Sequence, residues 1–160
     1  MWLAAIFTSA SGTSVTTMND ILQDFPIAAP PDRVFDAVSL PKGLDEWWTL
    51  RSNGRPEVGA SYELDFGPAY QWRAEVTKAV PGSAFELKMT RSDNDWDGTV
   101  VGFELEPSAN GTQVRFYHRG WPISNEHYRT SNHCWAMYLR ILRRHLENGE
   151  SVPYDQRLAV

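Results

Sequence analysis

The chain has 160 residues, of which 42% are hydrophobic and 12% aromatic, so a single domain can bury a core without disulfides or metals. Its formal net charge of −5 argues against a nucleic-acid partner, because phosphate binding needs a basic face. The single cysteine, Cys134, excludes an internal disulfide and a cysteine-based zinc site, and no apolar run approaches the ~20 residues that span a bilayer. A reducing compartment, the cytoplasm, is therefore the expected location.

The chain divides into three parts by composition. Residues 1–17, MWLAAIFTSASGTSVTT, contain a short apolar run without the basic flank of a signal peptide. We expect them to be a disordered leader or a misplaced start, with a degenerate signal peptide as the alternative. A single domain is expected over residues 18–150. The tail at 151–160 is expected to be a strap on the surface, pinned by Pro153-Tyr154, or a loose end.

The first predicted elements are a strand and two short helices. The segment ILQDFPIA (21–28) has the composition of a strand. The segment PPDRVFDAVS (30–39) predicts a helix, because proline suits the first turn and Asp32 suits the positive N-terminal end. Pro41 ends this helix, and LDEWW (44–48) predicts one or two further turns.

Between residues 61 and 120 the hydrophobic period changes from helical to alternating. Large apolar residues on one face and polar residues on the other predict antiparallel strands with one wet side. Asn110-Gly111 is a strong signal for a hairpin turn. The predicted strands are 61–67, 70–76, 85–89, 99–106 and 113–120.

The last predicted element is a long amphipathic helix over residues 126–148, ended by Gly149 as the residue after the helix. The order is then a strand, two short helices, a meander of five or six strands, and a long helix. This order predicts an α+β fold of two layers, in which a curved antiparallel sheet has the long helix across its concave face.

Two stretches resemble a known superfamily. APPDRVFDAVS followed by WW resembles the N-terminal part of the START-like, or SRPBCC, superfamily. HRGWP followed by CWAMYLRILRRHLENGE is similar to the C-terminal helix region of its branch named for homology to the activator of the heat-shock protein 90 ATPase. The resemblance covers about residues 20–150 and implies the helix-grip fold, also described as birch-pollen-allergen-like. It does not imply one function, since a fold hosts many.

A cavity between the sheet and the helix is the first functional hypothesis. A curved sheet and a straight helix leave a gap where facing side chains do not meet, and an aromatic wall suits a flat or greasy molecule. The alternative is that these large rings fill the space themselves. In DEWWT (45–49), one tryptophan is expected to face the gap and the other to cover its rim. The residues predicted to line the cavity are Trp47, Trp48, Tyr62, Phe66, Tyr70, Trp72, Phe85, Met89, Phe103, Phe116, His118, Trp135 and Tyr138.

His118 is the titratable residue of most interest. By alternation it points inward with Phe116, where an imidazole could orient a ligand or act as a general acid or base. The alternative is a hydrogen-bonded core histidine, because the sequence supplies no activating carboxylate beside it. Cys134 has no electropositive partner and is expected to be an inert apolar residue.

Other motifs are absent or misleading. DNDWDGTVVGFE (93–104) fits the pattern of a calcium-binding EF-hand loop, but its flanks predict strands where calcium binding needs helices, so an acidic hairpin tip is expected. The sequence has no P-loop, GxGxxG, GxSxG or HExxH motif, so we expect no cofactor and no metal. Arg140, Arg143 and Arg144, with His145, either complement the helix C-terminus or form a patch for an acidic partner.

Three functions follow as hypotheses. The first is non-catalytic binding of a small hydrophobic molecule, with Tyr70, Trp72 and His118 setting its orientation. The second is an enzyme that uses His118 or a cavity tyrosine, because the resemblance extends to cyclases, dehydratases and hydrolases. The third is an accessory to a chaperone ATPase, from the branch name alone. A monomer or a homodimer is expected.

Overall fold

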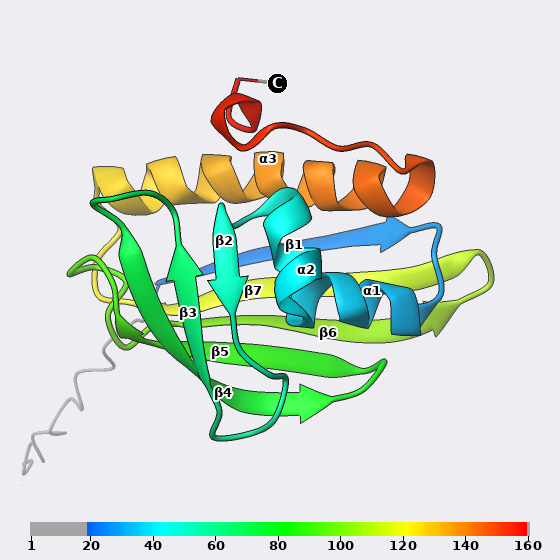
Figure 1. The fold of residues 1–160 in the computed structure, drawn as a ribbon, viewed down its shortest axis with the longest axis horizontal. Helices are drawn as coiled ribbons and strands as arrows, with labels where there is room; N and C mark the ends of the chain where they lie inside the picture. The colour runs from blue at the N-terminus through cyan, green and yellow to red at the C-terminus, as the bar shows by residue number, and fades with distance from the viewer. Residues whose placement is uncertain (1–18, 160) are drawn as a thin grey trace, which may run out of the picture.

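A computed structural model describes residues 19–159, so the predicted leader at 1–17 lies outside the described part of the chain (Figure 1). The first elements are β1 (Asn19–Ile27), α1 (Pro31–Ser39), α2 (Pro41–Trp47) and β2 (Arg51–Asn53). The strands β3 (Ser61–Asp65), β4 (Gln71–Val80), β5 (Ala84–Arg91), β6 (Val100–Ser108) and β7 (Gly111–Trp121) follow. The long helix α3 (Glu126–Asn148) and a short 3-10 turn, η1 (Tyr154–Gln156), complete the order.

The strands form one seven-stranded antiparallel sheet in the order β1-β7-β6-β5-β4-β3-β2. The first strand returns to pair with the last, with Phe25 opposite Val114. The sheet curves strongly, and α3 lies across its concave side (Figure 1). The predicted α+β helix-grip fold is confirmed. Only β2 was missed, because three residues are too few to show an alternating pattern.

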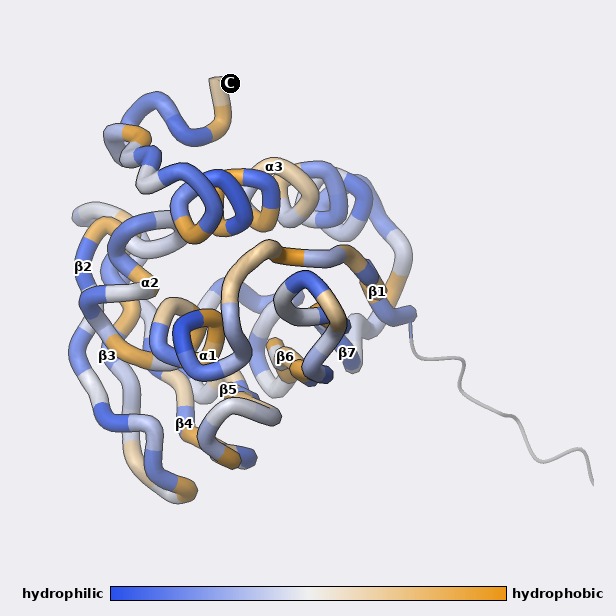
Figure 2. Tube along the Cα trace, turned by 90° about the vertical axis from the view of Figure 1, so that its right-hand side faces the viewer, coloured by the Kyte–Doolittle hydropathy of each residue, from blue (hydrophilic) through white to orange (hydrophobic). Residues whose placement is uncertain are grey.

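The two short helices occupy the inside of the curve below α3 (Figure 2). Pro31 begins α1 and Asp32 lies in its first turn, as the sequence predicts. The second helix packs tightly on the first at Gly43, where an added Cβ would lie 2.6 Å from the Cα of Ala37. A larger residue at 43 would push α2 away from α1, so the glycine sets the position of the tryptophans that follow.

Both ends of α3 are capped. The side chain of Asn125 accepts a hydrogen bond of 2.9 Å from the backbone N–H of Tyr128. Gly149 adopts a left-handed φ of 69° directly after the helix, which confirms its predicted role. The buried face of α3 carries Trp135, Leu139 and Leu142, and this face covers the sheet.

The half of the interior next to α1 and α2 is filled by rings. Trp47 packs edge-on against Phe103 at 6.0 Å between ring centroids, and Phe103 contacts Phe116 at 5.3 Å. Tyr62 packs against Phe85 at 5.8 Å and donates its hydroxyl to the carbonyl of Ser39 at 2.6 Å. In this half of the domain the alternative holds in which large side chains close the space.

Over residues 19–159, none of the helices has the length and apolar character needed to cross a membrane.

Candidate functional site

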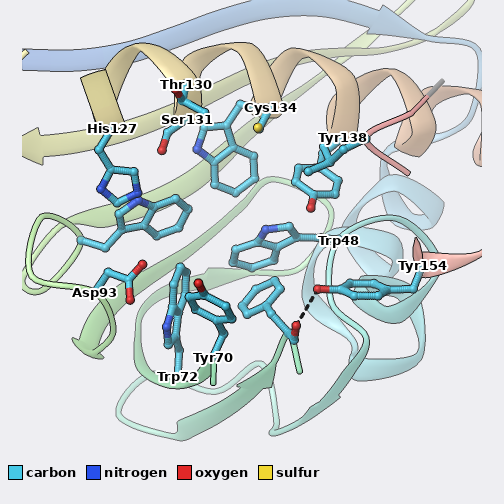
Figure 3. A pocket seen from close by; sticks show the side chains of 14 residues that line it. Trp48, Tyr70, Trp72, Asp93, His127, Thr130, Ser131, Cys134, Tyr138 and Tyr154 are labelled. Atoms are coloured by element: carbon cyan, nitrogen blue, oxygen red, sulfur yellow. Dashed lines mark hydrogen bonds between the residues drawn. The ribbon is translucent and has the colours of Figure 1, made fainter. Parts of the chain in front are cut away.

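A pocket of about 320 Å³ lies below the first half of α3, at the end of the grip away from α1 (Figure 3). Its walls come from five separate segments: the residue after α2, the β3–β4 region, the β5–β6 connection, α3 and the C-terminal tail. The lining residues are Trp48, Phe66, Tyr70, Trp72, Asp93, Trp96, His127, Thr130, Ser131, Cys134, Trp135, Tyr138, Tyr154 and Leu158.

Five aromatic side chains of this lining form a closed circuit of contacts. The ring centroids are 5.3 Å apart for Trp48 and Phe66, 5.0 Å for Phe66 and Trp72, and 4.8 Å for Trp72 and Trp96. Trp96 and Trp135 are 5.8 Å apart, and Trp135 returns to Trp48 at 5.2 Å. We call these five residues the aromatic ring. Because each is held by two neighbours, the wall is formed before any ligand arrives.

The two adjacent tryptophans have different positions. Trp47 is fully buried in the core, where its indole N–H donates to the carbonyl of Ala37 at 2.9 Å. Trp48 leaves the helical backbone, with φ −122° and ψ −68°, and lines the pocket. Their rings stack at 5.9 Å with an interplanar angle of 21°. The pair therefore connects the core to the aromatic ring, and neither indole covers a solvent-exposed rim.

Trp96 is the member of the aromatic ring that sequence reasoning missed. It lies in the expected acidic hairpin tip, yet it is only 7% exposed, because its indole packs against Trp72, His118 and Trp135. The side chain of Thr99 donates to the carbonyl of Trp96 at 2.6 Å and holds the tip in this position. The signal that could have found it was a large apolar residue alone among aspartates.

His118 is fully buried behind the aromatic ring and does not line the pocket. Its Nδ1 accepts from the indole N–H of Trp135 at 3.0 Å, so the proton of the neutral ring is on Nε2. Nε2 lies 2.8 Å from the hydroxyl of Thr99, which itself donates to Trp96. Burial lowers the pKa of His118 from 6.5 to about 3, with a smaller contribution from the nearby His127. The neutral imidazole thus connects two members of the aromatic ring: it bonds directly to Trp135 and, through Thr99, to Trp96.

The polar groups of the lining are hydroxyls, one thiol, one imidazole and one carboxylate. Burial raises the pKa of Tyr138 to about 12, so its hydroxyl stays protonated, and Figure 3 shows it directed into the pocket. Burial also raises the pKa of Cys134, which keeps the thiol protonated and unreactive. His127 lies 3.1 Å from Asp95, and hydrogen bonds from Asn125 and His127 hold the pKa of Asp95 below its usual value.

The C-terminal tail closes one side of the pocket. Tyr154 donates its hydroxyl to the carbonyl of Phe66 at 2.9 Å (Figure 3). The buried guanidinium of Arg157 donates to the carbonyls of Val152, Thr49 and Asp45 at 3.0, 3.0 and 2.6 Å. The tail is therefore the strap that was one of the two expectations, and Tyr154 and Leu158 become lining residues.

The structure divides the predicted lining residues into two groups. Those that line the pocket are Trp48, Phe66, Tyr70, Trp72, Trp135 and Tyr138. Those that lie in the filled core instead are Trp47, Tyr62, Phe85, Met89, Phe103, Phe116 and His118. The expectation was too broad for two physical reasons. The helices α1 and α2 occupy half of the concave side, and the inward residues there pack against helices and against one another. His118 is instead covered by Trp96, Trp121 and Trp135.

The EF-hand-like segment is built for other contacts. Asp97 accepts from the backbone N–H of Ser92 at 2.6 Å, and Asp95 is engaged by Asn125 and His127. Glu104 lies in β6, 3.9 Å from Lys78. Within residues 19–159 no three His, Cys, Asp or Glu side chains are grouped so that they could hold a metal ion.

The chain is similar to a known protein family. The family model described as "Activator of Hsp90 ATPase homolog 1-like protein" matches residues 28–147. A search of curated proteins found no significant match.

Several solved structures share the fold. The Aha1 dimer from Colwellia psychrerythraea is 30% identical, with 84% of this chain and 100% of that chain covered and a TM-score of 0.75. Protein MLL2253 from Mesorhizobium loti is 22% identical, with 82% and 99% covered and a TM-score of 0.70. DynU16, a protein in the dynemicin biosynthetic locus, is 22% identical, with 82% of this chain and 48% of that chain covered and a TM-score of 0.68. The last two likenesses concern the fold alone.

Proposed function

The chain belongs to the family of activator of Hsp90 ATPase homolog 1-like proteins, and from this premise we propose that it binds a small hydrophobic or aromatic molecule in the pocket below α3. The observation that carries the proposal is the aromatic ring, which borders a pocket of about 320 Å³. This volume is at the lower end of the range typical of small-molecule sites. A ligand of one or two fused rings fits it.

The composition of the wall indicates where the affinity comes from. Burying ~200 Å² of apolar ligand surface contributes roughly 5 kcal/mol at about 25 cal/mol per Å², before the costs of association. The aromatic ring supplies this surface without rearrangement, because its members already contact one another. Tyr138 offers a protonated hydroxyl for orientation. His118, expected to share that role, is enclosed behind the ring.

Binding without catalysis is the proposal, and the state of His118 supports it. A general base must reach the substrate and must have a pKa near the working pH. The His118 ring is fully buried, bonded at both nitrogens, and has a pKa lowered to about 3. Burial raises the pKa values of Cys134 and Tyr138, so both side chains stay protonated. Neither is therefore activated as a nucleophile or a base.

Two further proposals concern location and assembly. The lone Cys134 suits a reducing compartment, so we propose a cytoplasmic location. We also propose a homodimer, because the relative from Colwellia psychrerythraea is described as a dimer. Sedimentation velocity at micromolar concentration tests the dimer. The family description makes stimulation of a chaperone ATPase a separate assay, and a positive result there would add a second function.

The test of the binding proposal is a titration with a neutral two-ring probe, 1-methylnaphthalene, followed by isothermal titration calorimetry. We expect saturable binding with a Kd in the micromolar range. Thr130→Phe adds a large side chain at the exposed edge of the pocket and should weaken binding at least tenfold. His133→Phe is the matched control on the exposed face of the same helix and should bind within twofold of the wild type.

Two results would overturn the proposal. One is the absence of saturable binding by the wild type to any small apolar or aromatic probe. The other is unchanged affinity in Thr130→Phe, which would place the binding site somewhere else on the molecule. Native mass spectrometry of the purified protein adds a direct search for a retained ligand.

A further inference from the structure

We propose that the pocket selects positively charged ligands: a flat aromatic cation or a quaternary ammonium group, held by the faces of the aromatic ring and by the carboxylate of Asp93. The inference rests on the proposed function and narrows it to a ligand class. It starts from the charges that line the pocket. The lining contains no lysine and no arginine, and its one carboxylate belongs to Asp93.

Asp93 differs from its two neighbours in the β5–β6 connection. Asp95 is engaged by Asn125 and His127, and the carboxylate of Asp97 accepts from Ser92. The Asp93 carboxylate, half-buried at the pocket wall, has no hydrogen bond or ion pair within the described residues. The carboxylates of Asp95 and Asp97 therefore stabilise the tip, whereas the carboxylate of Asp93 is available to a ligand in the pocket.

The backbone holds Asp93 in position. The Asp93 carbonyl accepts from the N–H groups of Trp96 at 2.8 Å and Asp97 at 3.0 Å, so the turn is closed directly after Asp93. Figure 3 shows the carboxylate turned toward Trp72 and the interior of the pocket. A cation seated between Asp93 and Trp72 would contact a negative charge on one side and the face of an indole on the other.

Two basic side chains near the pocket are held by other groups. His127 is paired with Asp95 at 3.1 Å. The guanidinium of Arg157 lies 5.4 Å from the ring of Tyr154 and is occupied by three backbone carbonyls. Tyr154 stands at the end of the pocket opposite to Asp93 (Figure 3). An anionic ligand thus finds no lysine or arginine among the lining residues, and it meets the carboxylate of Asp93 instead.

The aromatic ring favours the same ligand class. The face of an indole carries partial negative charge, and a cation within about 6 Å of the ring centroid is attracted to it. Trp72 and Trp96, 4.8 Å apart, supply two such faces in the lining they share with Asp93. A delocalised or quaternary cation is weakly hydrated and loses less on entering an apolar pocket than a primary ammonium does. Such a cation would bury apolar surface against the indoles and place its charge beside the carboxylate of Asp93.

The test compares three probes of nearly equal shape that differ in charge: N-methylquinolinium, 1-methylnaphthalene and 1-naphthoate. Isothermal titration calorimetry at low ionic strength should show the cation binding at least tenfold more tightly than the neutral probe and the anion more weakly than either. Asp93→Asn should reduce the affinity for the cation about tenfold and leave the neutral probe within twofold. Asp24→Asn, which removes an equal charge from an exposed ion pair with Arg115, is the matched control and should change neither affinity.

Each outcome separates the two proposals. Equal or weaker binding of the cation than of 1-methylnaphthalene overturns the charge selectivity and leaves the binding function standing. A cation preference that survives in Asp93→Asn overturns the role of Asp93. Failure of all three probes to bind overturns the proposed function itself. Added salt should weaken the cation in the wild type and have little effect on it in Asp93→Asn, because only the wild type offers the opposite charge.

Discussion

Replacing His118 with glutamine should remove a defined part of the protein's pH-dependent stability. The ring is fully buried and neutral, and its pKa is lowered from 6.5 to about 3 by burial and by His127. Below pH 6.5 the unfolded chain takes up a proton at this position, whereas the folded chain does not until the pH approaches 3. The stabilising contribution of the neutral ring is therefore complete above pH 6.5 and is lost as the pH falls toward 3.

The size of the effect follows from the proton linkage. Between pH 7 and pH 5 the unfolded histidine becomes almost fully protonated and the folded one stays neutral, which costs about 2 kcal/mol of unfolding free energy. The number does not depend on the exact folded pKa, provided that it lies well below 5. Glutamine has no proton to take up, so His118→Gln lacks this loss. The variant also loses part of the bonding to Trp135 and Thr99, which costs roughly 1–3 kcal/mol at every pH.

The assay is denaturant unfolding of both proteins at pH 5, 6 and 7, followed by tryptophan fluorescence and circular dichroism. The stability difference between the wild type and His118→Gln should be about 2 kcal/mol larger at pH 7 than at pH 5. Carboxylates common to both proteins cancel in this difference. His133→Gln, on the exposed face of α3, is the control for the substitution itself and should leave the unfolding free energy at pH 7 within about 0.5 kcal/mol of the wild type. A constant difference for His118→Gln would refute the neutral, buried histidine.

Four further substitutions test other parts of the structure. Arg157→Ala removes a buried guanidinium from three backbone carbonyls, so it should destabilise the protein by about 2–3 kcal/mol. Hydrogen exchange in the tail, measured by mass spectrometry, should become faster. Unchanged exchange would mean that other contacts hold the tail on the domain. Trp47→Phe loses a buried hydrogen bond and should lower the unfolding free energy by about 2 kcal/mol in denaturant unfolding. Trp48→Phe should lower it by about 1 kcal/mol or less and should weaken probe binding instead. Equal losses of stability would contradict a core role for Trp47 and a pocket role for Trp48. Gly102→Ala would bring a methyl group against the buried ring of Tyr117 and should lower the unfolding free energy by about 1–3 kcal/mol, seen as a lower Tm. An unchanged Tm would show that the Tyr117 ring can move aside without loss of stability.

Much of the fold could be predicted from local patterns. Alternation between residues 61 and 120 gave the faces of the strands, because side chains on a strand point to opposite sides with a period of two. The apolar stripe and the final glycine gave the long helix and its end at Asn148. These signals depend on neighbours in the chain, which is why they can be read without the tertiary structure. The short strand β2 lacks such a signal and was missed.

The candidate site was predicted only in part. Periodicity shows that a side chain points inward, but it does not show what lies opposite. Phe103 and Trp135 both point inward, yet Phe103 meets Trp47 in a filled core and Trp135 borders the pocket. The difference is decided at α2: Trp47 packs on Phe103 in the core, whereas the next residue, Trp48, borders the pocket together with Trp135. Asp93 also could not be distinguished from Asp95 and Asp97 until the contacts of all three were known.

By itself the sequence determined the class of fold, the order of its elements and the aromatic character of its interior. These properties follow from composition and from short-range periods along the chain. Only the tertiary structure decided that Trp96 folds back from an acidic turn to join four other rings, that His118 is closed off behind them, and that the tail completes the wall. The reason is that a pocket is the space left when segments far apart in the chain fail to touch, and no local pattern records where that happens.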